Sequence, residues 1–170
     1  MRFGPCRWIH DILRYDAPAN LLLGNLPVAL RAGVIIVRES TIDALEHEAL
    51  QYLKDALKDR DAEFRPSQYE AIEHLVVHRR RVLVVQRTGW GKSLVYFIAT
   101  RLLRDHGAGP TLLISPLLSL MRNQIQMAEN VGLRAATINS SNTEQWRAVE
   151  DAIDNNEVDL LLIAPERLDN

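Results

Sequence analysis

Cysteine, long hydrophobic runs and a strong excess of either charge are all missing from this sequence. The single cysteine, Cys6, cannot form an internal disulfide, and no metal-ligand spacing of Cys and His accompanies it, which favours a reducing, cytoplasmic setting. The longest apolar stretch, residues 21–37, is interrupted by Pro27 and Arg31 and is too broken for a membrane span of about 20 residues. We therefore expect neither a disulfide scaffold nor a membrane partner.

The charge balance excludes a global electrostatic attraction to nucleic acid. The 20 basic and 22 acidic residues leave a formal net charge of -2, so the chain carries no overall basic field and no acidic excess typical of disorder. With 170 residues and 47% hydrophobic content, the chain can bury one domain-sized core. Any site for a polyanion must therefore be local.

The chain divides unevenly into two parts. Residues 1–40 show neither clean periodicity nor a motif, and we treat them as an N-terminal extension of unknown role. Between residues 41 and 60, apolar side chains recur three and four positions apart, which predicts an amphipathic helix. A second helix is expected from near Pro66 to the Arg79–Arg81 cluster. We assign residues 41–170 to the domain itself, so that its sheet is preceded by helices.

Beyond residue 81 the pattern changes to short apolar runs that alternate with longer amphipathic segments. The predicted strands are residues 81–85, 111–115, 134–138 and 159–164, and the predicted helices are residues 91–106, 117–130 and 143–155. Continuous apolar strands are typical of a parallel sheet that is covered on both faces. The sequence therefore predicts a three-layer α/β fold.

A glycine turn joins the first predicted strand to its helix. Residues 86–93 read Gln-Arg-Thr-Gly-Trp-Gly-Lys-Ser, which matches the phosphate-loop pattern G-x-x-x-x-G-K-[ST] except that Gln86 replaces the first glycine. In such a loop, backbone N–H groups and the helix N-terminus surround a phosphate, Lys92 reaches the outer phosphates and Ser93 offers its hydroxyl to Mg²⁺. Trp90, between the glycines, must point away from the phosphates. The strand-turn-helix context favours a nucleoside triphosphate site over an ordinary turn with an incidental Gly-Lys-Ser sequence.

Four segments carry a resemblance to a known family: residues 64–72 (FRPSQYEAI), 86–93 (QRTGWGKS), 115–124 (SPLLSLMRNQ) and 161–168 (LLIAPERL). In this order they resemble the RecQ-like ATP-dependent DNA helicases of superfamily two, which are of the DEAD/DEAH type. The resemblance implies a RecA-like P-loop domain, ATP and Mg²⁺ as cofactors, and 3′-to-5′ unwinding of DNA in repair and recombination, in the cytosol or nucleoid of a bacterial-type cell. It explains nothing of residues 1–60.

The first two segments supply the predicted nucleotide contacts. The Gln68 amide offers one acceptor and two donors, which match the N6–H and N7 groups of adenine and would select ATP over GTP; a solvated Gln at a helix start is the alternative. The resemblance implies that Lys92 is catalytic and that Ser93 is the Mg²⁺ ligand. The predicted cofactor-binding set is Phe64, Arg65, Gln68, Thr88, Gly89, Gly91, Lys92, Ser93 and Leu94.

The last two segments supply the predicted DNA contacts. Polar side chains among leucines suit the sugar-phosphate backbone of DNA at a single-strand or duplex junction, while the leucines themselves predict the start of a core helix. Glu166 with Arg167 forms either a capping pair or, as the resemblance implies, a further backbone contact. The predicted nucleic-acid set is Ser115, Ser119, Arg122, Gln124 and Arg167.

The resemblance also implies partners that this sequence does not contain. Family members carry an acidic Asp-Glu-Ala-His box some tens of residues beyond residues 161–168, and a second, C-terminal RecA-like domain that supplies an arginine. We therefore expect a truncated front part of a helicase that does not turn over ATP alone; otherwise Asp159 or Glu166 would be the first candidates for the catalytic acid. Two other classes stay open, namely a non-catalytic ATP-binding interaction module and a P-loop phosphotransferase such as a nucleotide kinase.

Overall fold

The computed structural model describes residues 39–116, 118–139 and 143–168, so the predicted extension lies outside it except for its last two residues. The elements, in chain order, are α2 (Glu39–Leu57), α3 (Gln68–Val76), α4 (Lys92–Asp105), β1 (Thr111–Ile114), α5 (Leu118–Asn130), β2 (Ala135–Ile138), the 3-10 turn η1 (Thr143–Gln145), α6 (Trp146–Asp154), β3 (Leu160–Ile163) and the 3-10 turn η2 (Pro165–Arg167). These bounds agree with the predicted helices and with three of the four predicted strands.

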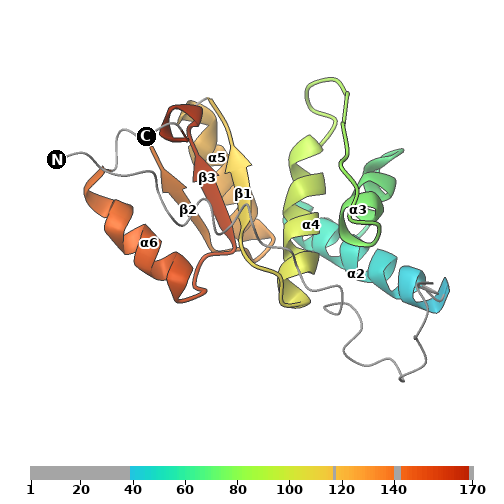
Figure 1. The fold of residues 1–170 in the computed structure, drawn as a ribbon. Helices are drawn as coiled ribbons and strands as arrows, with labels where there is room; N and C mark the ends of the chain where they lie inside the picture. The colour runs from blue at the N-terminus through green and yellow to red at the C-terminus, as the bar shows by residue number, and fades with distance from the viewer. Residues whose placement is uncertain (1–38, 117, 140–142, 169–170) are drawn as a thin grey trace, which may run out of the picture.

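The three strands form a parallel sheet in the order β1-β3-β2 (Figure 1). In the centre of the sheet, Leu161 of β3 is level with Leu112 of β1 on one side and with Ala136 of β2 on the other. All four residues of β3 are fully buried, which is why this strand is apolar at every position and not only at alternate ones. The predicted α/β class with a parallel sheet is confirmed.

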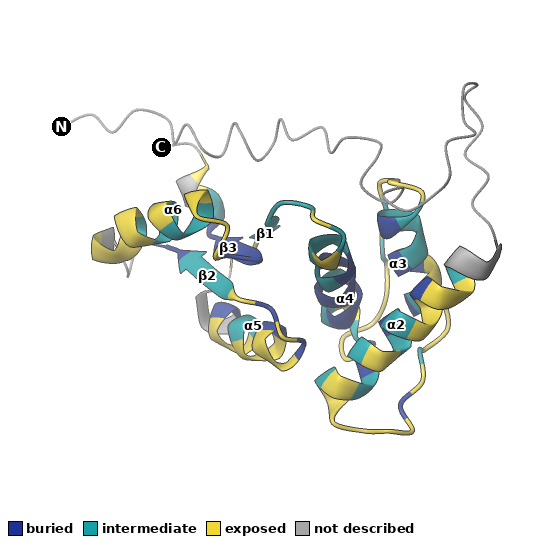
Figure 2. Cartoon of the chain, turned by 90° about the horizontal axis from the view of Figure 1, so that it is seen from below, coloured by how far each residue is buried: buried dark blue, intermediate teal, exposed yellow. Residues whose placement is uncertain are grey.

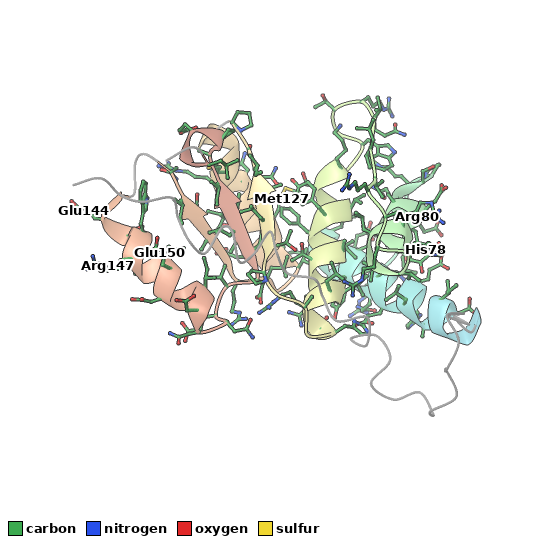
Figure 3. All side chains as sticks on the ribbon, in the orientation of Figure 1. His78, Arg80, Met127, Glu144, Arg147 and Glu150 are labelled. Atoms are coloured by element: carbon green, nitrogen blue, oxygen red, sulfur yellow. The ribbon has the colours of Figure 1, made fainter. Side chains whose placement is uncertain are left out.

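Helices cover both faces of the sheet, with α6 on one face and α5 on the other (Figure 2). Leu160 and Leu162 of β3 belong to the larger core, whereas Leu161 and Ile163 face the smaller core under α6. The opposite side of α6 is polar: Glu144, Arg147 and Glu150, labelled in Figure 3, lie along η1 and α6 on the side away from the strands. The alternation along β3 thus sets the two layers around the sheet.

A cluster of three helices, α2, α3 and α4, lies beside β1 and shares the larger core. Leu53 of α2, Ile72 of α3 and Phe97 of α4 are almost completely buried in it. The Tyr52 hydroxyl of α2 donates to the Asp105 carboxylate at the end of α4, and burial, followed by this hydrogen bond, raises the pKa of Tyr52 to about 12. α2 is the longest described helix, and no helix of the described residues has the length and apolar character needed to cross a membrane.

The prediction of a strand at residues 81–85 is wrong. Its side chains do alternate as in a strand: Val82 and Val84 pack against the larger core, while Leu83 and Val85 are 88% and 80% exposed. A strand also requires a hydrogen-bonded neighbour, and within the described part of the chain β1 pairs only with β3. The residues therefore form a connection with one apolar side packed and the other in solvent.

The turn between this connection and α4 requires glycine at two positions. Gly89 and Gly91 have φ angles of +79° and +99°, a region that residues with a Cβ atom rarely adopt. A Cβ atom at Gly91 would also lie 2.6 Å from the Gln68 amide nitrogen, whereas the space around Gly89 is open. The two glycines therefore differ. Gly89 is required only for the backbone conformation, whereas Gly91 also leaves space for the Gln68 side chain.

An ionic network around one buried carboxylate lies at the end of the sheet at which the strands begin. Asp159, directly before β3, accepts hydrogen bonds from the Arg134 backbone (2.8 Å), from the Arg134 guanidinium (2.8 and 2.9 Å) and from Arg104 Nε on α4 (2.7 Å). Burial raises the pKa of Asp159, but the hydrogen bonds from Arg134 and Arg104 outweigh that effect and hold the pKa well below its usual range. One carboxylate thus connects the starts of β2 and β3 to the end of α4.

We predict that Asp159→Asn lowers the free energy of unfolding at pH 7 by about 2–3 kcal/mol, because two guanidinium groups lose their anion. The pKa of Asp159 is depressed in the folded chain, so its contribution is complete above the unfolded pKa of about 4 and is lost as the pH falls below it. Urea unfolding between pH 7 and pH 3 should show the parent approaching the variant. Asp154→Asn, at an exposed position on α6, is the control, and a constant difference across this range would contradict the prediction.

We also predict that Gly91→Ala destabilises the chain more than Gly89→Ala. Both substitutions force a Cβ atom into the left-handed region, at about 1–2 kcal/mol. Gly91→Ala must in addition displace the Gln68 amide, which adds about 1–3 kcal/mol for the polar groups left without partners. Urea unfolding of the two variants beside the parent measures the difference, and equal losses would show that the close approach at Gly91 has no energetic weight.

Candidate nucleotide-binding site

Three segments meet at the N-terminal end of α4: residues 64–68 before α3, the turn at residues 86–91, and the first turn of α4 itself. Figure 1 shows this end of α4 at the same edge of the molecule as the end of β3, where η2 follows. Open α/β sheets place their ligand sites at the carboxyl ends of the strands. Asp159 stands at the opposite end of β3 and is held by two arginines, so it is not available as a catalytic acid at this site.

Lys92 curls back over the turn that it follows. Its ammonium nitrogen lies 2.7 Å from the carbonyl oxygen of Gln86 and 3.1 Å from that of Arg87, and its side chain remains exposed to solvent. The turn therefore holds the Lys92 ammonium at its solvent-exposed side, where a phosphate group could reach it. α4 contributes the partial positive charge of its N-terminus at the same place.

Gln68 is buried and holds the turn from the other side. Its Oε1 accepts a hydrogen bond from the Arg65 backbone N–H (2.8 Å), and its Nε2 donates to the carbonyl oxygens of Trp90 (3.0 Å) and Gly91 (3.4 Å). Arg65 adds a hydrogen bond from its guanidinium to the Gly89 carbonyl. Both ends of the Gln68 amide are engaged, so adenine recognition, which stays a prediction, requires an exchange of these bonds. The sequence analysis missed this clamp, and the glycine at position 91 is its only trace in the sequence.

Apolar contacts anchor the rest of the turn. Trp90 is 7% exposed and belongs to the larger core, so its side chain points into the core and away from the exposed residues of the turn. Phe64 is half-buried, and its ring centroid lies 5.7 Å from that of Tyr69. Thr88 is exposed on the turn, whereas the Leu94 side chain is buried in the core and leaves only its backbone for a ligand.

Ser93 is half-buried beside a cavity of about 450 Å³. The cavity is lined by Leu75, Val82, Val84, Lys92, Ser93, Val95, Tyr96 and Gln124. The Tyr96 hydroxyl lies 3.0 Å from Ser93 Oγ, and the Gln124 amide contacts both of these side chains. The residue predicted to bind metal therefore meets a residue that had been predicted to bind DNA.

The described residues of the predicted DNA-binding set have different surroundings. Ser115 is half-buried at the end of β1, where its backbone N–H donates to the Ile163 carbonyl (3.0 Å), and Arg122 is exposed on α5. Gln124, two residues along α5, is turned toward Ser93 instead. The side chains of Ser119 and Arg167 lie outside the described part of the structure. The DNA contacts stay a prediction.

The donor atoms at the site fit a magnesium ion that is carried mainly by phosphate oxygens. The described residues contain no group of three or more His, Cys, Asp or Glu side chains that could hold a metal ion by themselves. Mg²⁺ is usually bound through one or two protein oxygens together with substrate phosphates, and the Ser93 hydroxyl supplies one such oxygen next to Lys92. The residues present fit a nucleotide-bound cation.

Comparison with known proteins assigns the family. The sequence model of the DEAD/DEAH box helicases matches residues 65–170. The chain is 40% identical to the ATP-dependent DNA helicase RecQ of Haemophilus influenzae over 62% of this chain and 16% of the relative. It is 37% identical to RecQ of Bacillus subtilis over 62% of this chain and 17% of the relative, and 33% identical to the ATP-dependent DNA helicase Q1 of Mus musculus over 68% and 18%.

The chain thus spans less than a fifth of the length of these relatives. The match covers residues 65–68, the glycine turn, α4 and α5, which supply the described side chains of the candidate site. The chain belongs to the DEAD/DEAH box helicase family and is similar to its RecQ-type members.

Proposed function

We propose that this chain is the ATP-binding segment of a RecQ-type DNA helicase, in which ATP binding and hydrolysis drive 3′-to-5′ unwinding. The single observation that supports this most strongly is the glycine turn before α4, with Lys92 and Ser93 at its mouth. The names of the relatives support ATP as the nucleotide and DNA as the substrate. Such a protein works in the compartment that holds the DNA, which for a bacterial-type cell is the cytosol or nucleoid.

The chain's own residues bind and orient the triphosphate. The backbone N–H groups of the turn and the first turn of α4 surround the phosphates, and Lys92 exchanges its carbonyl partners for phosphate oxygens. Mg²⁺, when bound, neutralises phosphate charge and polarises the bond that breaks. Ser93 provides the oxygen of this chain that holds the ion. Further groups that activate water or stabilise the transition state belong to the rest of the helicase.

The adenine base lies, in this proposal, against residues 64–68. Arg65 is exposed next to the turn, Phe64 offers part of an aromatic face, and Gln68 carries the amide that can pair with the N6–H and N7 groups of adenine. Recognition of the base would then compete with the hydrogen bonds that Gln68 makes to the turn. Binding of the base would thus remove hydrogen bonds that Gln68 makes to the carbonyl groups of the turn.

DNA is the proposed macromolecular partner, bound through its sugar-phosphate backbone at a single-strand or duplex junction. Exposed Arg122 on α5 offers a cation, Ser115 lies at the end of β1, and Ser119 and Arg167 complete the proposed set. With a net charge of -2 the chain neutralises few phosphates, so its binding should be weak and should decrease as salt is added. A further RecA-like domain of the same helicase is the second proposed partner.

We predict that Lys92→Ala lowers the affinity of the chain for ATP by about ten- to a hundredfold, because a charge-assisted contact to the outer phosphates is lost. Titration with a fluorescent ATP analogue measures the change. Lys54→Ala, on α2, is the matched control and should bind as the parent does. Undiminished binding by Lys92→Ala would remove the turn from the nucleotide site.

The same substitution separates a helicase from a non-catalytic binding module. In the longer protein, steady-state ATP hydrolysis should be stimulated by single-stranded DNA in the parent and lost in Lys92→Ala. Nucleotide binding by a longer protein that shows no hydrolysis with or without DNA would favour the binding module instead.

We predict that Gln68→Ala reduces the preference for ATP over GTP by about tenfold, because one amide pairing with the base is worth roughly 1–3 kcal/mol. The ratio of the two affinities is the relevant measurement. Loss of the hydrogen bonds from Gln68 to the turn would by itself weaken ATP and GTP binding equally. A change in the ratio therefore reports only the contact between Gln68 and the base. Gln51→Ala, on the exposed side of α2, is the control. A variant with the parent's ratio would place adenine recognition elsewhere.

A further inference from the structure

Three polar side chains from two helices meet on the wall of the cavity beside the phosphate turn. Ser93 lies in the first turn of α4, Tyr96 follows one turn later, and Gln124 reaches across from α5. Tyr96 Oη is 3.0 Å from Ser93 Oγ and is bonded to Gln124 Oε1, and Gln124 Nε2 is 3.5 Å from Ser93 Oγ. Each side chain therefore contacts the other two.

The donors and acceptors of this triangle can be assigned from their chemistry. Gln124 Oε1 can only accept, so it takes the single proton of the Tyr96 hydroxyl. The Tyr96 oxygen is then free to accept the Ser93 proton, and the Gln124 amide donates to Ser93 Oγ. The three hydrogen bonds close into a ring in which every group donates once and accepts once. Within this ring, Ser93 Oγ keeps one lone pair that no member uses.

A serine oxygen with its proton turned away is the form that a hard cation binds. Mg²⁺ takes oxygen lone pairs in a narrow octahedral geometry, and a hydroxyl proton directed at the ion would oppose binding. The direction of the hydrogen bonds follows from Gln124 Oε1, which can only accept, so the Ser93 proton points to Tyr96 and away from a cation.

We propose that Tyr96 and Gln124 are positioning residues that orient the Ser93 hydroxyl as a ligand for the divalent cation of the bound nucleotide. The inference rests on the proposed function and deepens it. It also gives Gln124 a role toward the metal ion in place of the DNA contact expected from its segment. Tyr96 and Gln124 act through Ser93 and do not themselves touch the nucleotide.

The experiment measures how the binding of a fluorescent ATP analogue depends on Mg²⁺. Tyr96→Phe removes the hydroxyl oxygen and keeps the aromatic ring, whose centroid lies 4.7 Å from that of Phe97 in an edge-on arrangement. Gln124→Ala removes the amide that bonds both Tyr96 and Ser93. In each variant the Mg²⁺ concentration for half-maximal enhancement of binding should rise about two- to tenfold, the equivalent of one hydrogen bond. The affinity for the ATP analogue in excess EDTA should stay within about twofold of the parent's, because the three hydrogen-bonded side chains act only through the cation.

Matched controls and a double substitution test whether the effect passes through Ser93. Tyr52→Phe also removes one tyrosine hydroxyl, and Gln126→Ala changes an exposed amide two positions along α5; both should keep the parent's Mg²⁺ dependence. On a Ser93→Ala background, Tyr96→Phe should have no further effect, because neighbouring residues that act as a unit are non-additive.

The outcomes separate this inference from the proposed function. If the parent binds the nucleotide with Mg²⁺ dependence and Tyr96→Phe and Gln124→Ala keep the parent's curve, the positioning role is wrong and the nucleotide site stands. Equal weakening with Mg²⁺ and with EDTA would mean that the triangle only supports the fold, which also overturns the positioning role. A parent chain that binds no nucleotide under either condition overturns both proposals.

Discussion

The arrangement of the candidate site depends on one buried amide. Gln68 opens α3, accepts a hydrogen bond from the segment before it and donates to two carbonyl groups of the turn before α4. Besides these bonds, the turn is attached to its surroundings through Trp90 in the core, through the Arg65 guanidinium and through the start of α4. Because the amide nitrogen occupies the space where a Cβ atom of residue 91 would stand, the clamp and the glycine require each other. The phosphate side of the turn can therefore stay exposed while its shape remains fixed.

The two ends of the parallel strands lie next to differently bonded charged groups. At the end where the strands begin, the Asp159 carboxylate is paired with arginine side chains and with a backbone N–H group. Its charge therefore connects the starts of β2 and β3 to α4. At the opposite end, the Lys92 ammonium donates to carbonyl groups of the turn and stays exposed to solvent. A buried pair is expensive to break, and an exposed ammonium can change partners easily. The paired carboxylate and the exposed ammonium thus lie at opposite ends of α4.

The sequence predicted the elements whose pattern is local and failed where a distant partner decides. Helical spacing in residues 41–60 and the continuous leucines of β3 depend on which residue faces the core, and both predictions are confirmed. Residues 81–85 have the side-chain alternation of a strand but no strand beside them among the described residues, so local pattern gave the wrong element. The motif predicted a glycine turn followed by a helix, and the structure has that turn with Lys92 and Ser93 as the first two residues of α4. The clamp by Gln68 and the contact between Gln124 and Ser93 join segments far apart in the chain, and no spacing rule reports such contacts.

The carbonyl groups of the turn accept hydrogen bonds from side chains of this chain. Lys92, Arg65 and Gln68 all bind backbone carbonyls of the turn, and Ser93 is bonded within the triangle with Tyr96 and Gln124. In the proposed site, a nucleotide that recruits Lys92, Arg65, Gln68 or Ser93 exchanges the partners of these side chains, and an exchange of one neutral hydrogen bond for another contributes little, about 0.5–1.5 kcal/mol or less. The net gain must come from charge, since phosphate oxygens replace neutral carbonyls around an ammonium group and a helix N-terminus. If the turn binds the triphosphate as proposed, a preformed turn that gains mainly through charge would discriminate strongly for the phosphates and only weakly for the base, and selection of the base would depend on the one amide that also holds the turn.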